Sequence, residues 1–160
     1  MAVPPLKPLS LKGRALKYLA AREHSRAELQ RKLAPHAPDA QTLEQVLDEL
    51  EQRDFLSAAR FVESVIHRRG GQMGVARIRH ELDGKGIASD VMQQALSDLR
   101  HSELDRARAL WQRRFGTCPT DQKERARQMR FLQARGFPAA LVGRILREAG
   151  SPAHETDDSD

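Results

Sequence analysis

Residues 81–87, with the sequence ELDGKGI, recur in altered form at two other places in the chain. The related stretches read ELQRKL at 28–33 and FLQARGF at 131–137. Each places a leucine three residues before a cation, with an apolar residue soon after, and successive leucines are 53 and 50 residues apart. Because self-similarity at a fixed period is typical of tandem structural units, the chain is predicted to contain three copies of one unit.

A second motif follows each stretch with nearly the same period. It reads VLDEL at 46–50, ALSDL at 95–99 and ILREA at 145–149, with offsets of 49 and 50 residues. The leucines of the two motifs are 18 residues apart in the first copy and 14 in the others. The extra residues fit within 34–39, where two prolines disfavour a helix. An insertion that falls in a predicted loop supports a true repeat.

Each copy is expected to contain three short helices. Upstream of each stretch, apolar residues recur at positions i, i+3 and i+4, which is the pattern of one helix face. Ser25 and Glu28 have the spacing of a capping box, which predicts a helix start. Gly136 followed by Pro138 predicts the end of one helix and the beginning of the next. The other predicted helix N-caps are Asp39, Ser89 and Thr120.

The predicted fold is all-α, with three tandem three-helix repeats that form an elongated, curved right- or left-handed array. A unit of about 45 residues has a small core, and tandem units stabilise one another through contacts between neighbours. The predicted segments are a flexible N-terminal arm at 1–10, repeats at 11–56, 57–101 and 102–150, and an acidic disordered tail at 151–160.

Composition excludes several other classes of protein. Only 4% of the 160 residues are aromatic and 31% are charged, which disfavours a β-sandwich. The single cysteine, Cys118, excludes an internal disulfide framework and a multi-thiolate metal site. No apolar run approaches the roughly 20 residues of a membrane span, and the first residues lack the apolar core of a secretory signal. We therefore expect a cytoplasmic monomer that does not bind membranes.

The net charge of +5 hides an uneven distribution. Residues 106–147 carry eleven Lys or Arg residues and two acidic residues. Residues 39–63 carry two Lys or Arg residues and seven acidic residues. Basic segments indicate a polyanionic partner, either nucleic acid or an acidic protein groove. The alternative is that the basic helix faces are only solvated.

No motif indicates catalysis, a cofactor or a metal. The six histidines lack metal-ligand spacing, and no local signature of a catalytic base accompanies Cys118. The glycines at 70, 71 and 74 superficially resemble a phosphate-binding loop but lack its Lys-Ser/Thr and a preceding strand. A protein without enzymatic activity is therefore expected.

Taken together, the motifs resemble the RecX family of bacterial regulators, which modulate the recombinase RecA. The resemblance extends from Leu11 to about Gly150 and rests on three sets of residues in order and at the right spacing. The matching residues are RAL at 14–16 and SRxELxxKL at 25–33, then RF at 60–61, Arg68, Gly74, Ile78 and ELxxKGI at 81–87, then KxRxR at 123–127, RFLxxRGF at 130–137 and IL at 145–146.

The resemblance implies both fold and function. Family members are built from tandem three-helix repeats and bind the active RecA–DNA filament in its helical groove. They inhibit ATP hydrolysis, strand exchange and the co-protease activity that triggers the SOS response. Some members also bind DNA directly, so single- and double-stranded DNA are further expected partners.

One stretch departs from the family pattern. The family commonly has acidic residues just before the Arg-Phe or Arg-Tyr of the second copy, whereas this chain has LSAARF at 56–61. Ser57 can still cap a helix, but an acidic contact at that point is not carried over to this chain.

The candidate binding residues are cations of the second and third copies. Arginine suits the role because its planar guanidinium pairs with phosphate or carboxylate through two hydrogen bonds. The candidate partner- and DNA-binding residues are Arg68, Arg69, Arg77, Arg79, Arg113, Arg114, Lys123, Arg125, Arg127, Arg130 and Arg135. For Arg77 and Arg79 the alternative is the solvated side of a helix. Trp111 and Phe115 are interpreted as core residues rather than a base-stacking platform.

Two other functions stay open. Because three-helix units resemble helix-turn-helix modules, the chain could bind DNA without a recombinase. The third helices predicted at 41–52 and 89–100 are neutral to acidic, which disfavours base reading in the major groove. A pure scaffold is the third class, and the basic segments disfavour it. A direct DNA binder loses affinity steeply with salt, whereas a filament binder needs the recombinase.

Overall fold

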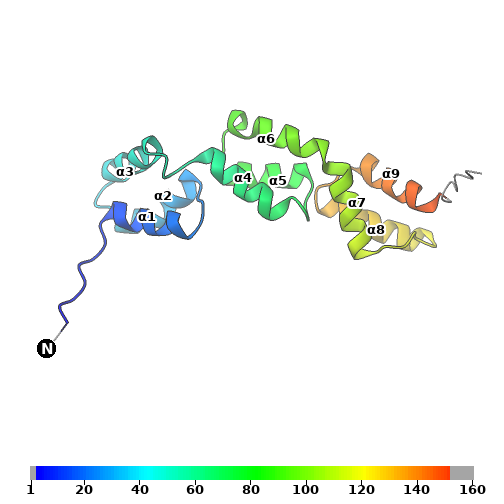
Figure 1. The fold of residues 1–160 in the computed structure, drawn as a ribbon, viewed down its shortest axis with the longest axis horizontal. Helices are drawn as coiled ribbons and strands as arrows, with labels where there is room; N and C mark the ends of the chain where they lie inside the picture. The colour runs from blue at the N-terminus through cyan, green and yellow to red at the C-terminus, as the bar shows by residue number, and fades with distance from the viewer. Residues whose placement is uncertain (1–2, 152–160) are drawn as a thin grey trace, which may run out of the picture. The chain divides into compact units, whose positions relative to one another are not determined.

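The computed structural model describes residues 3–151. Within that range it contains nine α-helices and one short 3-10 helix, without a β-strand (Figure 1). The helices are α1 (Leu11–Ala21), α2 (Arg26–Leu33), η1 (Ala34–His36), α3 (Ala40–Gln52), α4 (Ala58–Arg69), α5 (Val75–Gly84), α6 (Ser89–His101), α7 (Glu103–Arg114), α8 (Gln122–Ala134) and α9 (Ala139–Gly150). The predicted all-α class, with three helices in each copy, is confirmed.

The ends of the chain differ in what the structure describes. Residues 3–10 are exposed and have no helical structure. The predicted acidic tail lies outside the described residues from position 152 onward. None of the helices in the described part is both long and apolar enough to cross a membrane.

Contacts group the chain into two compact units, and the division runs through the second repeat. The first unit contains the chain up to Val65 together with Glu81–Ala95. The second unit contains Ile66–His80 together with the chain from Leu96 onward. Each unit therefore holds one terminal repeat and part of the middle repeat.

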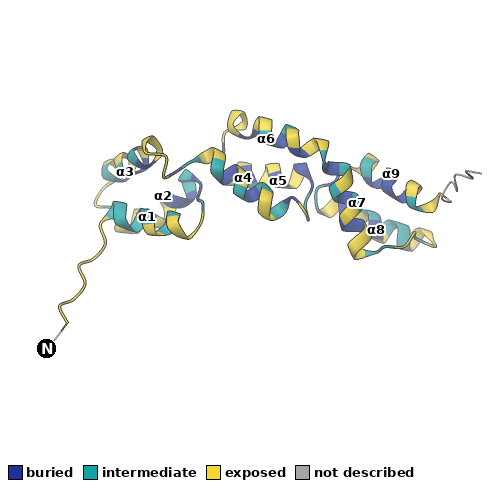
Figure 2. Cartoon of the chain, viewed as in Figure 1, coloured by how far each residue is buried: buried dark blue, intermediate teal, exposed yellow. Residues whose placement is uncertain are grey.

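The core of the first unit is made by leucines of α2 and α3 that pack with Ala15 of α1 (Figure 2). On α3, Leu43, Leu47 and Leu50 recur at helical spacing and form one buried face. On α2, Leu29 is fully buried together with the last residue of the helix. The leucines of the first copy are therefore core residues, as the repeat pattern predicts.

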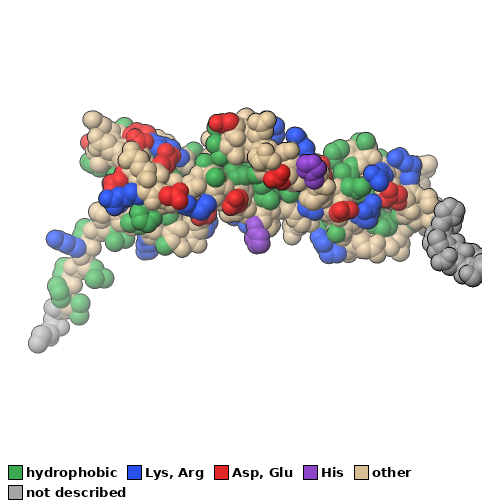
Figure 3. Space-filling view, turned by 45° about the horizontal axis from the view of Figure 1, so that its top comes forward, with side chains coloured by type: hydrophobic (Ala, Val, Ile, Leu, Met, Phe, Trp, Pro, Cys, Tyr) green, Lys and Arg blue, Asp and Glu red, His purple; other side chains and the backbone are tan. Residues whose placement is uncertain are grey.

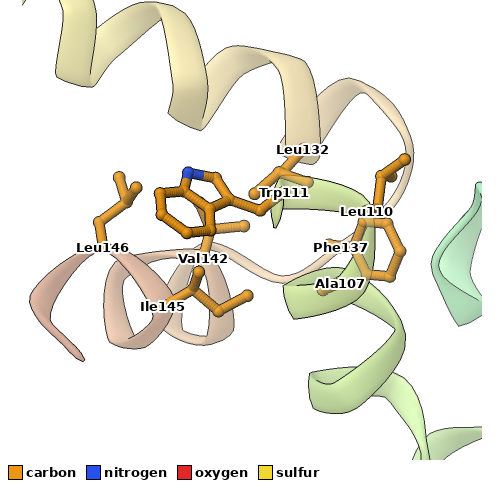
Figure 4. Close-up of a cluster of buried hydrophobic side chains, with 8 residues drawn as sticks. All are labelled: Ala107, Leu110, Trp111, Leu132, Phe137, Val142, Ile145 and Leu146. Atoms are coloured by element: carbon orange, nitrogen blue, oxygen red, sulfur yellow. The ribbon is translucent and has the colours of Figure 1, made fainter. Parts of the chain in front are cut away.

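The core of the third repeat forms around Trp111 of α7. Figure 4 shows its indole among Leu132 of α8 and Val142 and Ile145 of α9, in one buried cluster. The indole N–H donates to the Oε1 atom of Gln128 at 2.8 Å, which satisfies both buried polar groups. Trp111 is only 6% exposed, so its interpretation as a core residue is confirmed.

Several helix starts follow the local sequence. Ser25 and Glu28 form the predicted capping box, in which each side chain accepts a hydrogen bond from the other's amide. Asp39 caps α3. At the start of α4, the Ser57 hydroxyl accepts a hydrogen bond from the amide of Arg60 at 3.2 Å. Ser57 therefore caps this helix without the acidic residues that are common in the family.

Three local predictions are wrong. Thr120 is not the N-cap of α8, because the neighbouring Asp121 carboxylate accepts the hydrogen bond from the Glu124 amide at 2.7 Å. Ser89 is the first residue of α6 rather than its cap. The prolines after α2 do not exclude every helical turn, since Pro35 lies in the 3-10 helix η1 at a position that needs no amide donor.

The repeated stretch that defines the copies also joins them. Gly86 and Gly136 end the second helix of their repeats with φ angles of +75° and +87°. A Cβ atom on Gly86 would lie 3.5 Å from that of Ala27, and one on Gly136 would lie 2.6 Å from that of Arg77. Ala27 and Arg77 belong to the first turns of α2 and α5. The same turn thus docks on the same helix of the preceding repeat, and we call these contacts the first and second joints.

In the second joint, the glycine-rich segment at 70–74 is held by α7. Arg106 donates hydrogen bonds to the carbonyls of Gly70 and Met73, the latter at 2.7 Å. The Glu103 carboxylate accepts a hydrogen bond from the first amide of α5 at 2.9 Å. This segment, which resembles a phosphate-binding loop in sequence, is therefore a structural connection between repeats.

Candidate functional site

All eleven predicted cations belong to the second unit. They lie at the end of α4 (Arg68, Arg69), on α5 (Arg77, Arg79), at the end of α7 (Arg113, Arg114), on α8 (Lys123, Arg125, Arg127, Arg130) and just after α8 (Arg135). The structure brings part of this set together, and that part lies on the third repeat.

Three of the predicted arginines converge on two phenylalanine rings. Phe115 and Phe131 pack edge to face, with ring centroids 5.2 Å apart. The guanidinium carbons of Arg114 and Arg135 lie 5.4 and 3.9 Å from the Phe131 centroid. That of Arg127 lies 5.6 Å from the Phe115 centroid. The negative face of an aromatic ring attracts a guanidinium group, so the rings orient these side chains.

A hollow of about 330 Å³ lies beside these rings. We call it the arginine hollow, and it is lined by Gln72, Leu110, Arg113, Arg114, Phe131 and Arg135. The Arg113 guanidinium donates to the carbonyl of Gly71 at 3.0 Å, which fixes its position. No set of His, Cys, Asp or Glu side chains in the described part of the chain could hold a metal ion. The chemistry that the hollow offers is the binding of an anion by guanidinium groups.

The cations that line the arginine hollow are not neutralised within the described part of the chain. Among residues 3–151, no carboxylate forms an ion pair with Arg113, Arg114 or Arg135. The lining also contains no acidic side chain. Three positive charges therefore face one hollow, an arrangement that repels cations and attracts a polyanion.

Some cations of the first unit are instead paired with carboxylates. Arg26 lies 2.6, 2.8 and 3.1 Å from the carboxylates of Glu44, Asp48 and Glu51. Other cations of the first repeat are also paired, such as Lys12 with an acidic residue of α3 at 2.6 Å. At the left of Figure 3, acidic side chains in red lie among basic ones in blue over these helices. Several cations of the first repeat are therefore neutralised within it.

The cations of α8 extend the basic surface. Lys123, Arg127 and Arg130 are exposed and share one helix face, because they are spaced i, i+4 and i+7. Arg127 also pairs with Glu124 at 3.2 Å. Arg125 points elsewhere, since it lines a separate hollow with residues 119–122.

The predicted residues of the second repeat are not part of the arginine hollow. Arg68, Arg77 and Arg79 are exposed on α4 and α5, and Arg69 is half-buried. The backbone of Arg77 instead packs against Gly136 in the second joint.

Three lining residues were not among the predicted site residues, namely Gln72, Leu110 and Phe131. A signal for Phe131 was present, because the repeated stretch begins with Glu28 and Glu81 in the first two copies and with Phe131 in the third. Replacement of a repeated carboxylate by an aromatic residue is the change expected where a repeat acquires a different surface chemistry.

Fold and site together define a class: a protein of tandem three-helix repeats with an arginine-lined hollow on its last described repeat. Family models of the first, second and third three-helix domains of RecX match residues 12–50, 59–96 and 101–146. The chain belongs to the RecX family of regulatory proteins, and the resemblance inferred from its motifs is confirmed.

Individual relatives and solved structures agree with this assignment. The chain is 62% identical to the regulatory protein RecX of Leptothrix cholodnii over 149 residues, which cover 93% of each chain. It is 49% identical to that of Ralstonia nicotianae, over 96% of this chain and 97% of the relative. Its fold matches the crystal structure of RecX from Lactobacillus salivarius with a TM-score of 0.71 at 19% identity, over 87% of this chain and 94% of that one. A second RecX crystal structure matches with a TM-score of 0.72 at 20% identity, over 84% and 70% of the two chains.

Proposed function

We propose that this protein binds the RecA–DNA filament and inhibits its ATPase, strand-exchange and co-protease activities, and that it thereby regulates DNA repair and the SOS response. Family membership supports a regulatory role, since the relatives are named regulatory proteins. One observation carries the binding proposal. The third repeat presents three arginines around one hollow, and no carboxylate of the described chain forms an ion pair with them.

Regulation of this kind needs binding and no bond chemistry. A recombinase filament presents DNA phosphates and acidic protein surface, and guanidinium groups pair with both. A bound regulator that bridges neighbouring recombinase subunits opposes the movements that accompany ATP turnover. It also blocks the access of other substrates to the filament. The excess positive charge speeds association with such a polyanion at low salt.

The test is an assay of single-strand-dependent ATP hydrolysis by the cognate recombinase, into which this protein is titrated. We expect inhibition. A midpoint well below one regulator per recombinase subunit supports capping or bridging of filaments, and a midpoint near one supports occupancy of the groove. Absence of inhibition by protein that is helical by circular dichroism contradicts the proposal.

The second candidate function is direct DNA binding without the recombinase. The arginine hollow favours it, because it can contact a phosphate on DNA alone. In the first repeat, the third helix α3 carries the carboxylates that neutralise Arg26, which disfavours base reading by that helix. Steep loss of DNA affinity with salt, measured without recombinase and combined with absence of ATPase inhibition, supports this alternative.

A further inference from the structure

Both joints between repeats have a basic hollow beside them. At the first joint, a hollow of about 360 Å³ is lined by Arg22, Glu28, Arg31, Lys32 and Lys85, and we call it the glutamate hollow. The arginine hollow lies at the second joint. Lys85 of the first hollow and Arg135 of the second occupy the same position of the repeated stretch, 50 residues apart. Arg22 of the first repeat also lines the glutamate hollow, and Gln72 of the second repeat lines the arginine hollow.

The glutamate hollow is lined by a carboxylate of the protein itself, that of Glu28. Glu28 is only 7% exposed, and its carboxylate lies 2.8 Å from the Lys85 ammonium and 3.2 Å from the Arg22 guanidinium. The same carboxylate accepts a hydrogen bond from the Ser25 amide at 3.2 Å. The first joint therefore shows that the repeated cation can bind a carboxylate held by the preceding repeat.

No carboxylate of the described residues lines the arginine hollow. In the repeated stretch, Glu81 occupies the position of Glu28, and Glu81 does not line the arginine hollow. The guanidinium groups that line this hollow are already ordered: Arg113 bonds a backbone carbonyl at 3.0 Å, and Arg135 lies 3.9 Å from the Phe131 centroid. Ordered side chains lose less conformational entropy when a ligand binds, so the hollow is preorganised for an anion from outside the chain.

We propose that the arginine hollow binds a backbone phosphate of a single nucleic-acid strand through Arg113, Arg114 and Arg135. The inference rests on the proposed function, because it names the group that the basic surface contacts. A strand is favoured over an acidic protein segment by two features. The exposed cations Lys123 and Arg130 continue the basic surface along α8, and a strand carries one negative charge on every nucleotide. The adjacent phenylalanine ring suits the sugars and bases of a strand better than carboxylates.

The direct test is the binding of fluorescein-labelled oligo(dT) of about twenty nucleotides, measured by fluorescence anisotropy without recombinase. We expect Arg114→Gln and Arg135→Gln each to weaken binding roughly threefold to tenfold. Each variant should also reduce the steepness of log affinity against log salt concentration, which we call the salt slope, by about one. Gln72→Glu, which adds a carboxylate to the hollow, is expected to weaken binding similarly. The control is Arg144→Gln, which makes the same charge change at an exposed α9 residue that pairs with Glu148 at 2.8 Å. The Arg144→Gln variant should bind oligo(dT) within about twofold of the wild-type affinity.

A gain of binding is expected when the first joint loses its own anion. Glu28→Gln removes the negative charge from the glutamate hollow, while glutamine still accepts the hydrogen bond of the capping box. Arg22 and Lys85 are then released for a second phosphate. We expect roughly threefold tighter oligo(dT) binding and a salt slope larger by about one. Structural damage alone would not produce this gain.

The outcomes separate this inference from the proposed function. Hollow variants that are folded and bind oligo(dT) as tightly as wild type overturn the inference, even where wild type inhibits the recombinase. Weakened oligo(dT) binding by the variants, with no ATPase inhibition by wild type, supports the inference and contradicts the function. Variants that lose only filament affinity identify an acidic protein group as the occupant and overturn the inference. Inorganic phosphate that binds as tightly as the strand, at equal ionic strength, also overturns the choice of a strand.

Discussion

Gly74 and Gly136 meet backbone to backbone in the second joint. Gly136 has a φ angle of +87°, in the left-handed region that L side chains rarely adopt. A Cβ atom on Gly136 would lie 2.6 Å from the Cβ and 2.7 Å from the backbone nitrogen of Arg77. A Cβ atom on Gly74 would overlap the carbonyl group of Gly136. Glycine is required at both positions by space, and at Gly136 also by conformation.

We expect Gly136→Ala to lower the free energy of unfolding by about 2–4 kcal/mol, because both the strained φ angle and the overlap with Arg77 must be relieved. Urea unfolding followed by circular dichroism measures this change. The matched control is Gly84→Ala, at the end of α5, where a Cβ atom would meet nothing within 4 Å. The control should be neutral or stabilising by up to about 1 kcal/mol. Equal destabilisation by the two variants would contradict the proposed packing.

Glu28 makes the first joint sensitive to acid. Burial raises the pKa of Glu28, but Lys85, Arg22 and the Ser25 amide outweigh burial and lower the pKa to about 2 from its usual 4.5. Because the folded-state pKa is depressed, the ionised carboxylate stabilises the folded state above pH 4.5, and this contribution is lost as the pH falls toward 2.

The measurement is the free energy of unfolding in urea at about pH 6 and about pH 3, for wild type and Glu28→Gln. We expect wild type to lose on the order of 2 kcal/mol more than the variant over this interval. Parallel pH profiles of the two proteins would show that Glu28 is not held by the ion pairs of the first joint.

At the scale of elements, α7 and α8 are connected by one buried polar contact inside an apolar core. The Trp111 indole donates to Gln128, and the amide of Gln128 donates to the Thr117 carbonyl at 3.2 Å. The loop before α8 is therefore tied to the same side chain that fixes the indole. This contact aligns the two helices whose ends carry the arginines of the hollow.

Trp111→Phe is expected to lower the free energy of unfolding by about 1–3 kcal/mol, because it leaves the buried Gln128 oxygen without a donor. Thermal and urea unfolding measure the loss. A double-mutant cycle with Gln128→Met supplies the control, since removal of both polar groups should cost less than the sum of the single changes. Strict additivity would mean that the hydrogen bond contributes nothing.

At the scale of the whole molecule, the first and third repeats differ in what holds their cations in place. Some cations of the first repeat hold helices together, as Arg26 does with three carboxylates. Cations of the third repeat are oriented by aromatic rings and a backbone carbonyl, which leaves their charge available. Paired cations such as Arg26 thus stabilise the first repeat, and we expect the arginines of the hollow to serve recognition.

We expect Lys123→Gln combined with Arg130→Gln to weaken inhibition of the recombinase ATPase roughly tenfold, with little change in stability. Arg26→Gln should have the opposite pattern: unchanged inhibition, with a loss of a few tenths to about 1 kcal/mol in unfolding free energy because three carboxylates lose their partner. The midpoints of ATPase titrations and of urea unfolding distinguish the two effects. Equal loss of inhibition in both variants would contradict the division between repeats.

The sequence by itself determined the class, the repeats and most helix positions. Apolar spacing shows directly which helix face is buried, so Leu29 and Leu82 could be predicted as core residues. Segregation of charge along the chain also placed all eleven candidate cations in residues that fold into one unit. The choice of Asp121 rather than Thr120 as the N-cap of α8 was not predictable, because it depends on which side chain reaches the free amide of the first turn.

Only the tertiary structure decided which cations act together. Phe131, Arg114 and Gln72 are far apart in sequence and meet because α7 and α8 pack on a common core and the segment at 70–74 is held against α7. The structure also showed that Glu28 lines the glutamate hollow, whereas its counterpart in the repeated stretch, Glu81, does not line the arginine hollow. Local patterns determine helices because hydrogen bonds and buried faces recur within a few residues. Ion pairs and hollows depend on distances between helices, which the order of residues alone does not specify.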